Sequence, residues 1–191
     1  MWISKFLTGA PENSSCAEEA RTFALLRRLE IPFTAVQHDD AETMADCAAV
    51  SDVLGVRICK NLFLCNRQKT AFYLLAMPEG KPFHTGELSR QIGSSRLSFA
   101  PPEEMVRLLG CHPGSASVLG LAFDTGNQVR LLMDSPVAEA EWFGCHPCKN
   151  DCSLRLKTAD LLYRFLPFTG HEPQVVSLTG TACPPVPAPP L

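Results

Sequence analysis

Two long apolar runs, separated by a short polar segment, dominate the middle of the chain. Residues 58–65 read ICKNLFLC and residues 71–77 read AFYLLAM, with NRQK between the runs. Runs of this length joined by a short polar loop are typical of a β-hairpin. The sequence therefore places an antiparallel pair of strands at the centre of the fold.

Segments with helical spacing of apolar residues alternate with further short strands. Helices are expected over 12–31, 42–55, 84–93, 101–110 and 158–166. Strands are expected over 33–39, 128–134, 153–156 and 173–178. No regular βαβ repeat appears. We expect an α+β fold, a single domain with a central mixed, largely antiparallel β-sheet surrounded by helices.

The length of the chain favours one domain. With 191 residues, 46% of them hydrophobic, the chain can bury one core. Residues 181–191 contain five prolines and read as a Pro-rich tail that cannot contribute to a core. We expect an N-terminal extension over 1–15, a folded domain over 16–180 and this tail.

The charge of the chain limits its partners. The formal net charge is −3, so the chain lacks the excess of basic residues that binding to a long DNA duplex requires. Any contact with nucleic acid should therefore be local. Six basic residues in the middle of the chain could form a local patch: Lys60, Arg67, Lys69, Lys81, Arg90 and Arg96. No signal peptide and no membrane-spanning run is apparent, so we expect a cytoplasmic protein.

Three cysteines and one histidine stand within the segment FGCHPCKNDC at 143–152. Structural zinc sites usually pair two Cys/His doublets, and no second C-x2-C is present. In an extended segment Cys145 and His146 point to opposite faces, so the histidine cannot activate the thiol. Nine cysteines at irregular spacings predict buried free thiols, with no metal and no cofactor.

Two further features have both a structural and a functional interpretation. The loop PGSASVLGL at 113–121 could cradle a carbonyl oxygen or a phosphate with its backbone N–H groups, or be a tight turn. Lys60 stands in an apolar strand, where it faces either solvent or a polar cleft. In a cleft, its ammonium would suit a phosphate or a developing oxyanion.

Three segments, at 54–83, 95–121 and 145–166, together resemble the YbaK/prolyl-tRNA-synthetase-associated editing domain family. The likeness rests on KNLFL at 60–64, SRLSFA at 95–100 and PGSAS at 113–117, and it extends over about residues 20–170. Within the family, the chain is most similar to the freestanding alanyl-tRNA(Pro) deacylases. The family's fold, a mixed sheet with surrounding helices, agrees with the pattern of predicted elements.

The resemblance implies a site. Lys60, Gly114 and His146 fall on the family's catalytic positions. The expected substrate-binding residues are Asn61, Ser115, Ala116, Ser117 and Asn150, to which we add Met44 as a wall of the pocket. The loop at 114–117 would fix the ester carbonyl and the terminal adenosine, and Lys60 would hold a phosphate or the sugar. His146 and Asn61 would line the amino-acid pocket, and the 2′-hydroxyl of the tRNA would help to activate water.

The resemblance also implies a function, a trans-editing hydrolase that removes alanine from tRNA(Pro). The expected partner is the acceptor end of an aminoacyl-tRNA, the protein is expected to be a monomer, and participation of prolyl-tRNA synthetase is left open. Two departures from the family pattern, Val118 in place of proline and Cys145 in place of an aromatic residue, leave the amino acid open. The alternatives are removal of cysteine or serine, a non-catalytic tRNA- or synthetase-binding module, and a metal or redox protein that uses Cys145, Cys148 and Cys152.

Overall fold

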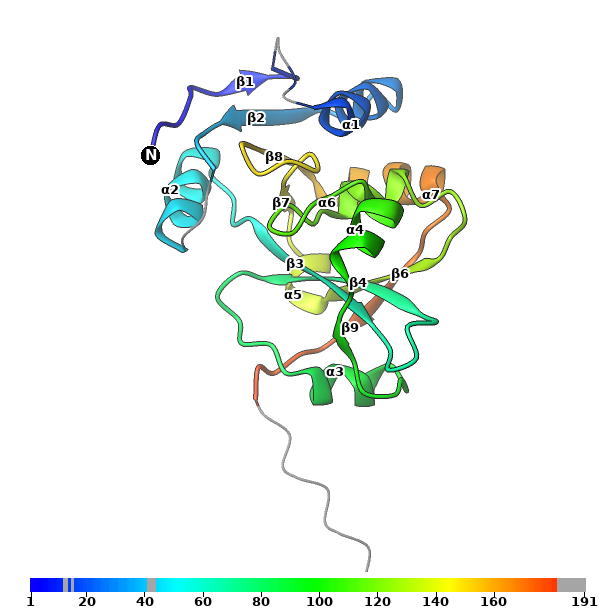
Figure 1. The fold of residues 1–191 in the computed structure, drawn as a ribbon. Helices are drawn as coiled ribbons and strands as arrows, with labels where there is room; N and C mark the ends of the chain where they lie inside the picture. The colour runs from blue at the N-terminus through cyan, green and yellow to red at the C-terminus, as the bar shows by residue number, and fades with distance from the viewer. Residues whose placement is uncertain (12–13, 15, 41–43, 182–191) are drawn as a thin grey trace, which may run out of the picture.

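The computed structural model describes residues 1–11, 14, 16–40 and 44–181, which form two β-sheets enclosed by helices (Figure 1). The four-stranded antiparallel sheet has the order β1 (Leu7–Thr8), β2 (Phe33–Gln37), β8 (Cys152–Lys157) and β7 (Trp142–Cys145). The five-stranded sheet has the order β5 (Ser98–Phe99), β3 (Cys59–Cys65), β4 (Phe72–Pro78), β6 (Val129–Asp134) and β9 (Pro173–Val176). β6 runs parallel to both neighbours, so this sheet is mixed. The predicted α+β class is confirmed, with the strands shared between two sheets.

The predicted hairpin is the β3–β4 pair at the centre of the mixed sheet. Its register runs from Cys59 opposite Pro78 to Cys65 opposite Phe72. On one face, Leu74 joins the main core that both sheets share, while on the other face Leu75 packs with Leu88 of α3 (Thr85–Gln91). Strands covered on both faces read as continuous apolar runs, which is why these two show little alternation.

Helices cover both sheets close to the expected positions. Besides α3, they are α1 (Ala17–Arg28), α2 (Met44–Leu54), α4 (Pro102–Leu109), α5 (Ser135–Ala138), α6 (Thr158–Asp160) and α7 (Leu166–Thr169), with a 3-10 turn η1 (Val118–Ala122). The helix expected over 158–166 is divided by η2 (Leu161–Phe165), a π-helical turn. Pro167 in the first turn of α7 has no N–H for the carbonyl of Tyr163, which interrupts the regular α-helical ladder.

The two sheets meet at the isolated parallel bridge between Ile58 and Gly144. A Cβ atom on Gly144 would lie 2.8 Å from the backbone oxygen of Arg57, so only glycine allows this approach. β7, which carries Gly144, was not predicted from the sequence because WFGC is short and contains a glycine. The bridge brings the start of β3 next to the end of β7.

The ends of the chain pack against the domain. The expected N-terminal extension contributes β1, which pairs with β2, and a bridge between Ile3 and His38. At the other end, residues 177–181 lie beside α3, at the edge of the molecule far from β1 (Figure 1). Residues 182–191 of the expected tail lie outside the described residues. In the described part of the chain, no helix combines the length and the apolar character that crossing a membrane requires.

Candidate active site

A cavity of about 430 Å³ opens where the start of β3 meets the loop before η1 and the end of β7. Its walls are largely apolar and include Ile58, Phe63, Ala100 and Met105. Five of the residues expected at the site line it together: Lys60, Asn61, Gly114, Ala116 and His146. These residues come from three separate segments: the bridge between Ile58 and Gly144 joins β3 to β7, and the Ser117 hydroxyl ties the loop to the backbone of His146.

Lys60, the second residue of β3, places its ammonium group at this cavity. Burial lowers the pKa of Lys60 from its ordinary value of 10.5, and the nearby carboxylate of Glu79 opposes the shift. The Nζ atom donates a hydrogen bond to the backbone oxygen of Lys81 at 2.7 Å. The amine therefore lies in a partly desolvated cavity with one fixed partner.

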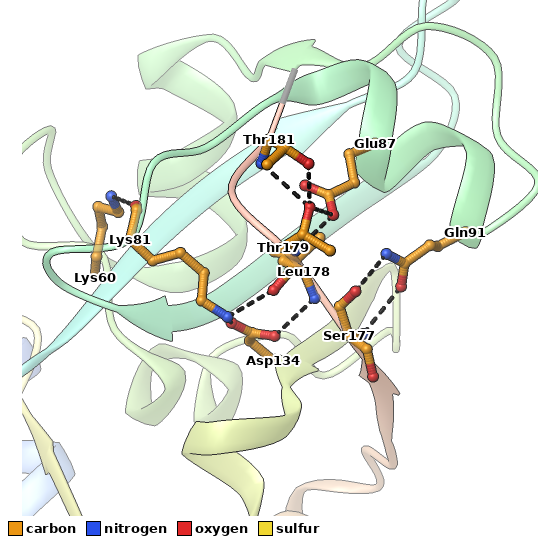
Figure 2. Close-up of polar contacts among 9 residues, drawn as sticks. All are labelled: Lys60, Lys81, Glu87, Gln91, Asp134, Ser177, Leu178, Thr179 and Thr181. Atoms are coloured by element: carbon orange, nitrogen blue, oxygen red, sulfur yellow. Dashed lines mark hydrogen bonds and ion pairs between the residues drawn. The ribbon is translucent and has the colours of Figure 1, made fainter. Parts of the chain in front are cut away.

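That partner is itself held firmly, as Figure 2 shows. The side chain of Lys81 forms an ion pair with the fully buried carboxylate of Asp134, and it donates to the backbone oxygen of Leu178 at 2.8 Å. Asp134 also accepts a hydrogen bond from the N–H of Leu178 at 3.0 Å. Farther along the same segment, Glu87 of α3 accepts from the N–H of Thr179 at 2.6 Å. The segment 177–181 thus fixes the backbone of Lys81, to which Lys60 donates its hydrogen bond.

Asn61 presents an unpartnered acceptor. Its Nδ2 donates to the backbone oxygen of Cys59 at 3.3 Å, whereas the other polar atom of the amide, Oδ1, has no such partner among the described residues. Oδ1 is buried, and no residue of the described chain donates to it. A buried acceptor without a donor costs about 1–3 kcal/mol, and this cost falls on a residue that lines the cavity.

His146 follows β7 directly, and its ring is buried. Nδ1 lies 3.1 Å from the backbone oxygen of Cys152 and 3.3 Å from Oγ of Ser153. Because a carbonyl oxygen only accepts, Nδ1 carries the proton and the neutral ring keeps its lone pair on Nε2. Burial lowers the pKa of His146 from 6.5, an effect that His38 reinforces and that the carbonyl of Cys152 and the charge of Asp151 oppose. The neutral form is therefore the stable form near pH 7.

A second histidine, His38, fixes the ring orientation of His146 through Ser153. Nε2 of His38 lies 2.8 Å from Oγ of Ser153, and Nδ1 of His38 lies 2.7 Å from the backbone oxygen of Asp39. With Nδ1–H of His38 donating to Asp39, Nε2 accepts from the Ser153 hydroxyl, which in turn accepts from His146. The chain of hydrogen bonds is consistent in direction and holds one tautomer of His146.

The loop at 113–117 is shaped by its serines and supplies free amides. Ser115 exchanges hydrogen bonds with the backbone of His112, and the Ser117 hydroxyl donates to the backbone oxygen of His146 at 2.5 Å. Gly114 adopts a left-handed conformation with φ of 92°. Among the described residues, the N–H groups of Gly114 and Ala116 meet no acceptor. Both residues line the cavity, so their amides are candidate donors to a carbonyl oxygen there.

The other expected site residues lie elsewhere. Ser115 and Ser117 are buried and do not line the cavity, so they act on it through the loop backbone. Asn150 lines a separate hollow of about 510 Å³ together with Ser115 and Lys149. The side chain of Met44 lies outside the described residues, although Cys47 of the same helix lines the cavity.

The two departures from the family pattern do not reach the cavity walls. Val118 and Cys145 are fully buried, and neither lines the cavity. Burial raises the pKa of the Cys59 thiol to about 12 and also raises the pKa of Cys145 and Cys152. Protonated thiols are poor nucleophiles and poor metal ligands. In the part of the chain that the structure describes, no group of three or more His, Cys, Asp or Glu side chains is placed to hold a metal ion.

Several residues that shape the site were not expected from the sequence. Glu79 lines the cavity, Ser153 and His38 orient His146, and Asp134 anchors the support of Lys60. An aspartate that ends an apolar strand, as in QVRLLMD, is a signal that could have pointed to Asp134. The contacts of the other three residues depend on tertiary pairing that no local pattern reveals.

Comparisons with known proteins relate the chain to a described family. The sequence model of a family described as the aminoacyl-tRNA editing domain matches residues 38–163. The prolyl-tRNA synthetase associated domain-containing protein 1 of Danio rerio is 32% identical over 80% of this chain and 83% of its own length. The prolyl-tRNA editing protein ProX of Acetoanaerobium sticklandii is 28% identical over 72% of this chain and 84% of its own. A crystal structure described as a candidate trans-editing enzyme for prolyl tRNA synthetase shares the fold, with a TM-score of 0.63, 18% identity and coverage of 86% and 98% of the two chains.

Proposed function

The chain belongs to the aminoacyl-tRNA editing domain family. We propose that it is a deacylase that removes a wrongly attached small amino acid, alanine, from tRNA(Pro). The names of the relatives, which refer to prolyl-tRNA editing and to prolyl-tRNA synthetase, support tRNA(Pro) as the carrier. The observation that carries the proposal is the cavity itself, at which Lys60, Asn61 and His146 meet the loop residues Gly114 and Ala116.

The aminoacyl group fits these donors and acceptors. Its α-ammonium lies beside Asn61, which lines the cavity. The N–H groups of Gly114 and Ala116 bind the ester carbonyl and stabilise the negative charge that develops there. One such donor contributes roughly 3 kcal/mol in the transition state. The apolar walls of the cavity then surround a short side chain.

Water is activated beside the ester. Nε2 of His146 accepts a hydrogen bond from the attacking water, because the other ring nitrogen is committed to Cys152. The 2′-hydroxyl of the terminal ribose assists. As the carbonyl–oxygen bond to the ribose breaks, the proton taken from water passes to the ribose oxygen, and free amino acid and tRNA are released.

Lys60 orients the tRNA side of the ester. Its ammonium group is anchored at Lys81 and faces the cavity with further donors available, so it binds the sugar or the phosphate of the terminal nucleotide. The acceptor end of the tRNA is the proposed partner. A prolyl-tRNA synthetase that releases the mischarged tRNA is a second proposed partner, and an aminoacyl-tRNA substrate suits the cytoplasmic location expected from the sequence.

The proposal is tested with tRNA(Pro) charged in turn with alanine, serine, cysteine and proline. We expect the purified protein to release alanine well above the spontaneous rate and to spare proline. A synthetase pocket for proline rejects the smaller alanine weakly, because missing methylenes are worth only about 1–3 kcal/mol, so a second site is needed. Faster release of serine or cysteine would reassign the amino acid, and binding of tRNA without release of any amino acid would replace the deacylase by a binding module.

A further inference from the structure

A second hollow, of about 620 Å³, adjoins the cavity of about 430 Å³ described above, which is called the amino-acid cavity from here on. Lys60, Leu62 and Phe99 line both spaces, so these three side chains form a shared wall. The remaining lining comes from the segment that leads into α3, namely Phe83, His84, Thr85 and Gly86. A ligand that fills the first cavity and extends past Lys60 therefore enters this hollow.

Phe99 gives the hollow an aromatic surface. Its side chain is 65% exposed, although the residue belongs to the edge strand β5 and pairs with Leu64. The next residue, Ala100, donates its N–H to the backbone oxygen of Phe63 at 3.0 Å, which holds the strand in place. An exposed aromatic ring on a fixed backbone is a stacking surface for a nucleobase, since every base offers a π-face.

We propose that this hollow binds the terminal adenosine of the tRNA acceptor end, with its base stacked on Phe99. This inference rests on the proposed function. The scissile ester joins the amino acid to the ribose of that nucleoside, so the nucleoside must lie directly beside the amino-acid cavity. Lys60 on the shared wall then stands at the junction between amino acid and ribose.

The polar groups of the hollow suit a nucleoside. Its lining contains no carboxylate and includes the ammonium group of Lys60. His84 and Thr85 also line the hollow, and their ring nitrogens and hydroxyl are groups that can hydrogen-bond to the base edge or the ribose. A Cβ atom at Gly86 would meet nothing within 4 Å, which leaves that side open for the rest of the acceptor strand.

A third hollow, which Asn150 lines, is less suited to a nucleoside. It shares Gly114 with the amino-acid cavity and is the region to which the sequence assigns the adenosine. Its lining has no Phe, Tyr or Trp, and it includes the carboxylate of Asp40, which repels a phosphate. Lys149 and His112 offer some compensation, so this hollow is the alternative that the experiment must exclude.

The direct test is an NMR titration of the wild-type protein with adenosine 5′-monophosphate. We expect chemical-shift changes at the amides of residues 83–86 and 99, and none at residues 112–115. Shifts confined to 112–115, or no shifts in either region, overturn the proposal. The titration needs no catalysis. Deacylation without shifts at 83–86 and 99 therefore rejects the nucleoside site alone, and shifts without deacylation reject the proposed function alone.

Kinetics with aminoacyl-tRNA provide the second test. Phe99→Ala should raise KM for alanyl-tRNA(Pro) about ten-fold with a smaller change in kcat, because one stacking contact is lost. Phe99→Trp should keep KM near the wild-type value. Tyr163→Ala, which removes an aromatic ring that is 77% exposed on η2, is the matched control and should change nothing. Wild-type KM in Phe99→Ala would overturn the proposal.

Discussion

The Nζ atom of Lys60 lies 2.7 Å from the backbone oxygen of Lys81, while the ammonium of Lys81 itself is paired with Asp134. Two lysines that appear equivalent in the sequence therefore have different roles. Lys60 offers its charge to the cavity, and Lys81 uses its charge to fix the backbone that holds Lys60. Lys81 therefore drops out of the basic patch expected from the sequence, because its ammonium is paired with Asp134 and is not available to an external phosphate.

Asp134→Asn tests this support. The substitution keeps the size of the side chain but leaves the ammonium of Lys81 without its counter-ion. Lys81 is partly exposed, so the expected loss of stability is about 1–3 kcal/mol, below that of a fully buried pair. Urea unfolding measures the loss, and kcat/KM should fall in folded protein. Asp160→Asn, which breaks the surface pair with Arg164, is the control and should cost about 0.5 kcal/mol or less.

Ser153→Ala tests the chain of hydrogen bonds behind His146. The substitution leaves the buried Nε2 of His38 without its donor, and His146 keeps only the carbonyl of Cys152. We expect a loss of about 1–3 kcal/mol in the free energy of unfolding and a lower kcat with little change in KM. Ser95→Ala, at an exposed position, serves as the control. An unchanged kcat in Ser153→Ala would show that this chain does not position the ring.

The lowered pKa of His146 predicts an acid limb in the pH profile. The native protein binds a proton at His146 less readily than the unfolded chain, whose pKa is near 6.5. The contribution of His146 to stability is therefore complete above pH 6.5 and is lost as the pH falls through the native pKa. Deacylation should fall over the same acidic range because Nε2 loses its lone pair. A limb of kcat/KM centred above pH 6.5, or one that persists in His146→Gln, would contradict this assignment.

Gly144→Ala tests the contact between the two sheets. The added methyl group would lie 2.8 Å from the backbone oxygen of Arg57, so the strands must separate. Overpacking of this kind costs about 1–3 kcal/mol, which the midpoint of urea unfolding should show. Gly80→Ala is the matched control, since a Cβ there meets nothing within 4 Å. Equal midpoints for the two variants would mean that the bridge tolerates a side chain.

Local patterns revealed most of the elements of the fold. The hairpin of β3 and β4, the helices and the strand β6 follow from apolar runs and helical spacing. The division into two sheets could not be predicted, because it depends on which strand pairs with β2 and on the approach at Gly144. Both are long-range contacts without a local signal.

The candidate site was predictable where a motif marks it. Lys60, Asn61, Gly114, Ala116 and His146 were identified through the family resemblance, and the structure places all five at one cavity. The motif could not show that Ser117 is buried and tied to the backbone of His146, because that bond joins segments far apart in sequence. Nor could it place Asn150, whose side chain lines the neighbouring hollow.

We propose that the aminoacyl ester is hydrolysed in the cavity beside Lys60. Single-turnover release of alanine from alanyl-tRNA(Pro) tests it most directly, with wild-type protein, Lys60→Ala and the control Lys5→Ala, an exposed lysine of the N-terminal segment. We expect the wild type and Lys5→Ala to release alanine at the same rate and Lys60→Ala to be slower by about 100-fold, as for the loss of one preorganised donor. Release by folded Lys60→Ala at the wild-type rate would show that hydrolysis does not take place at Lys60.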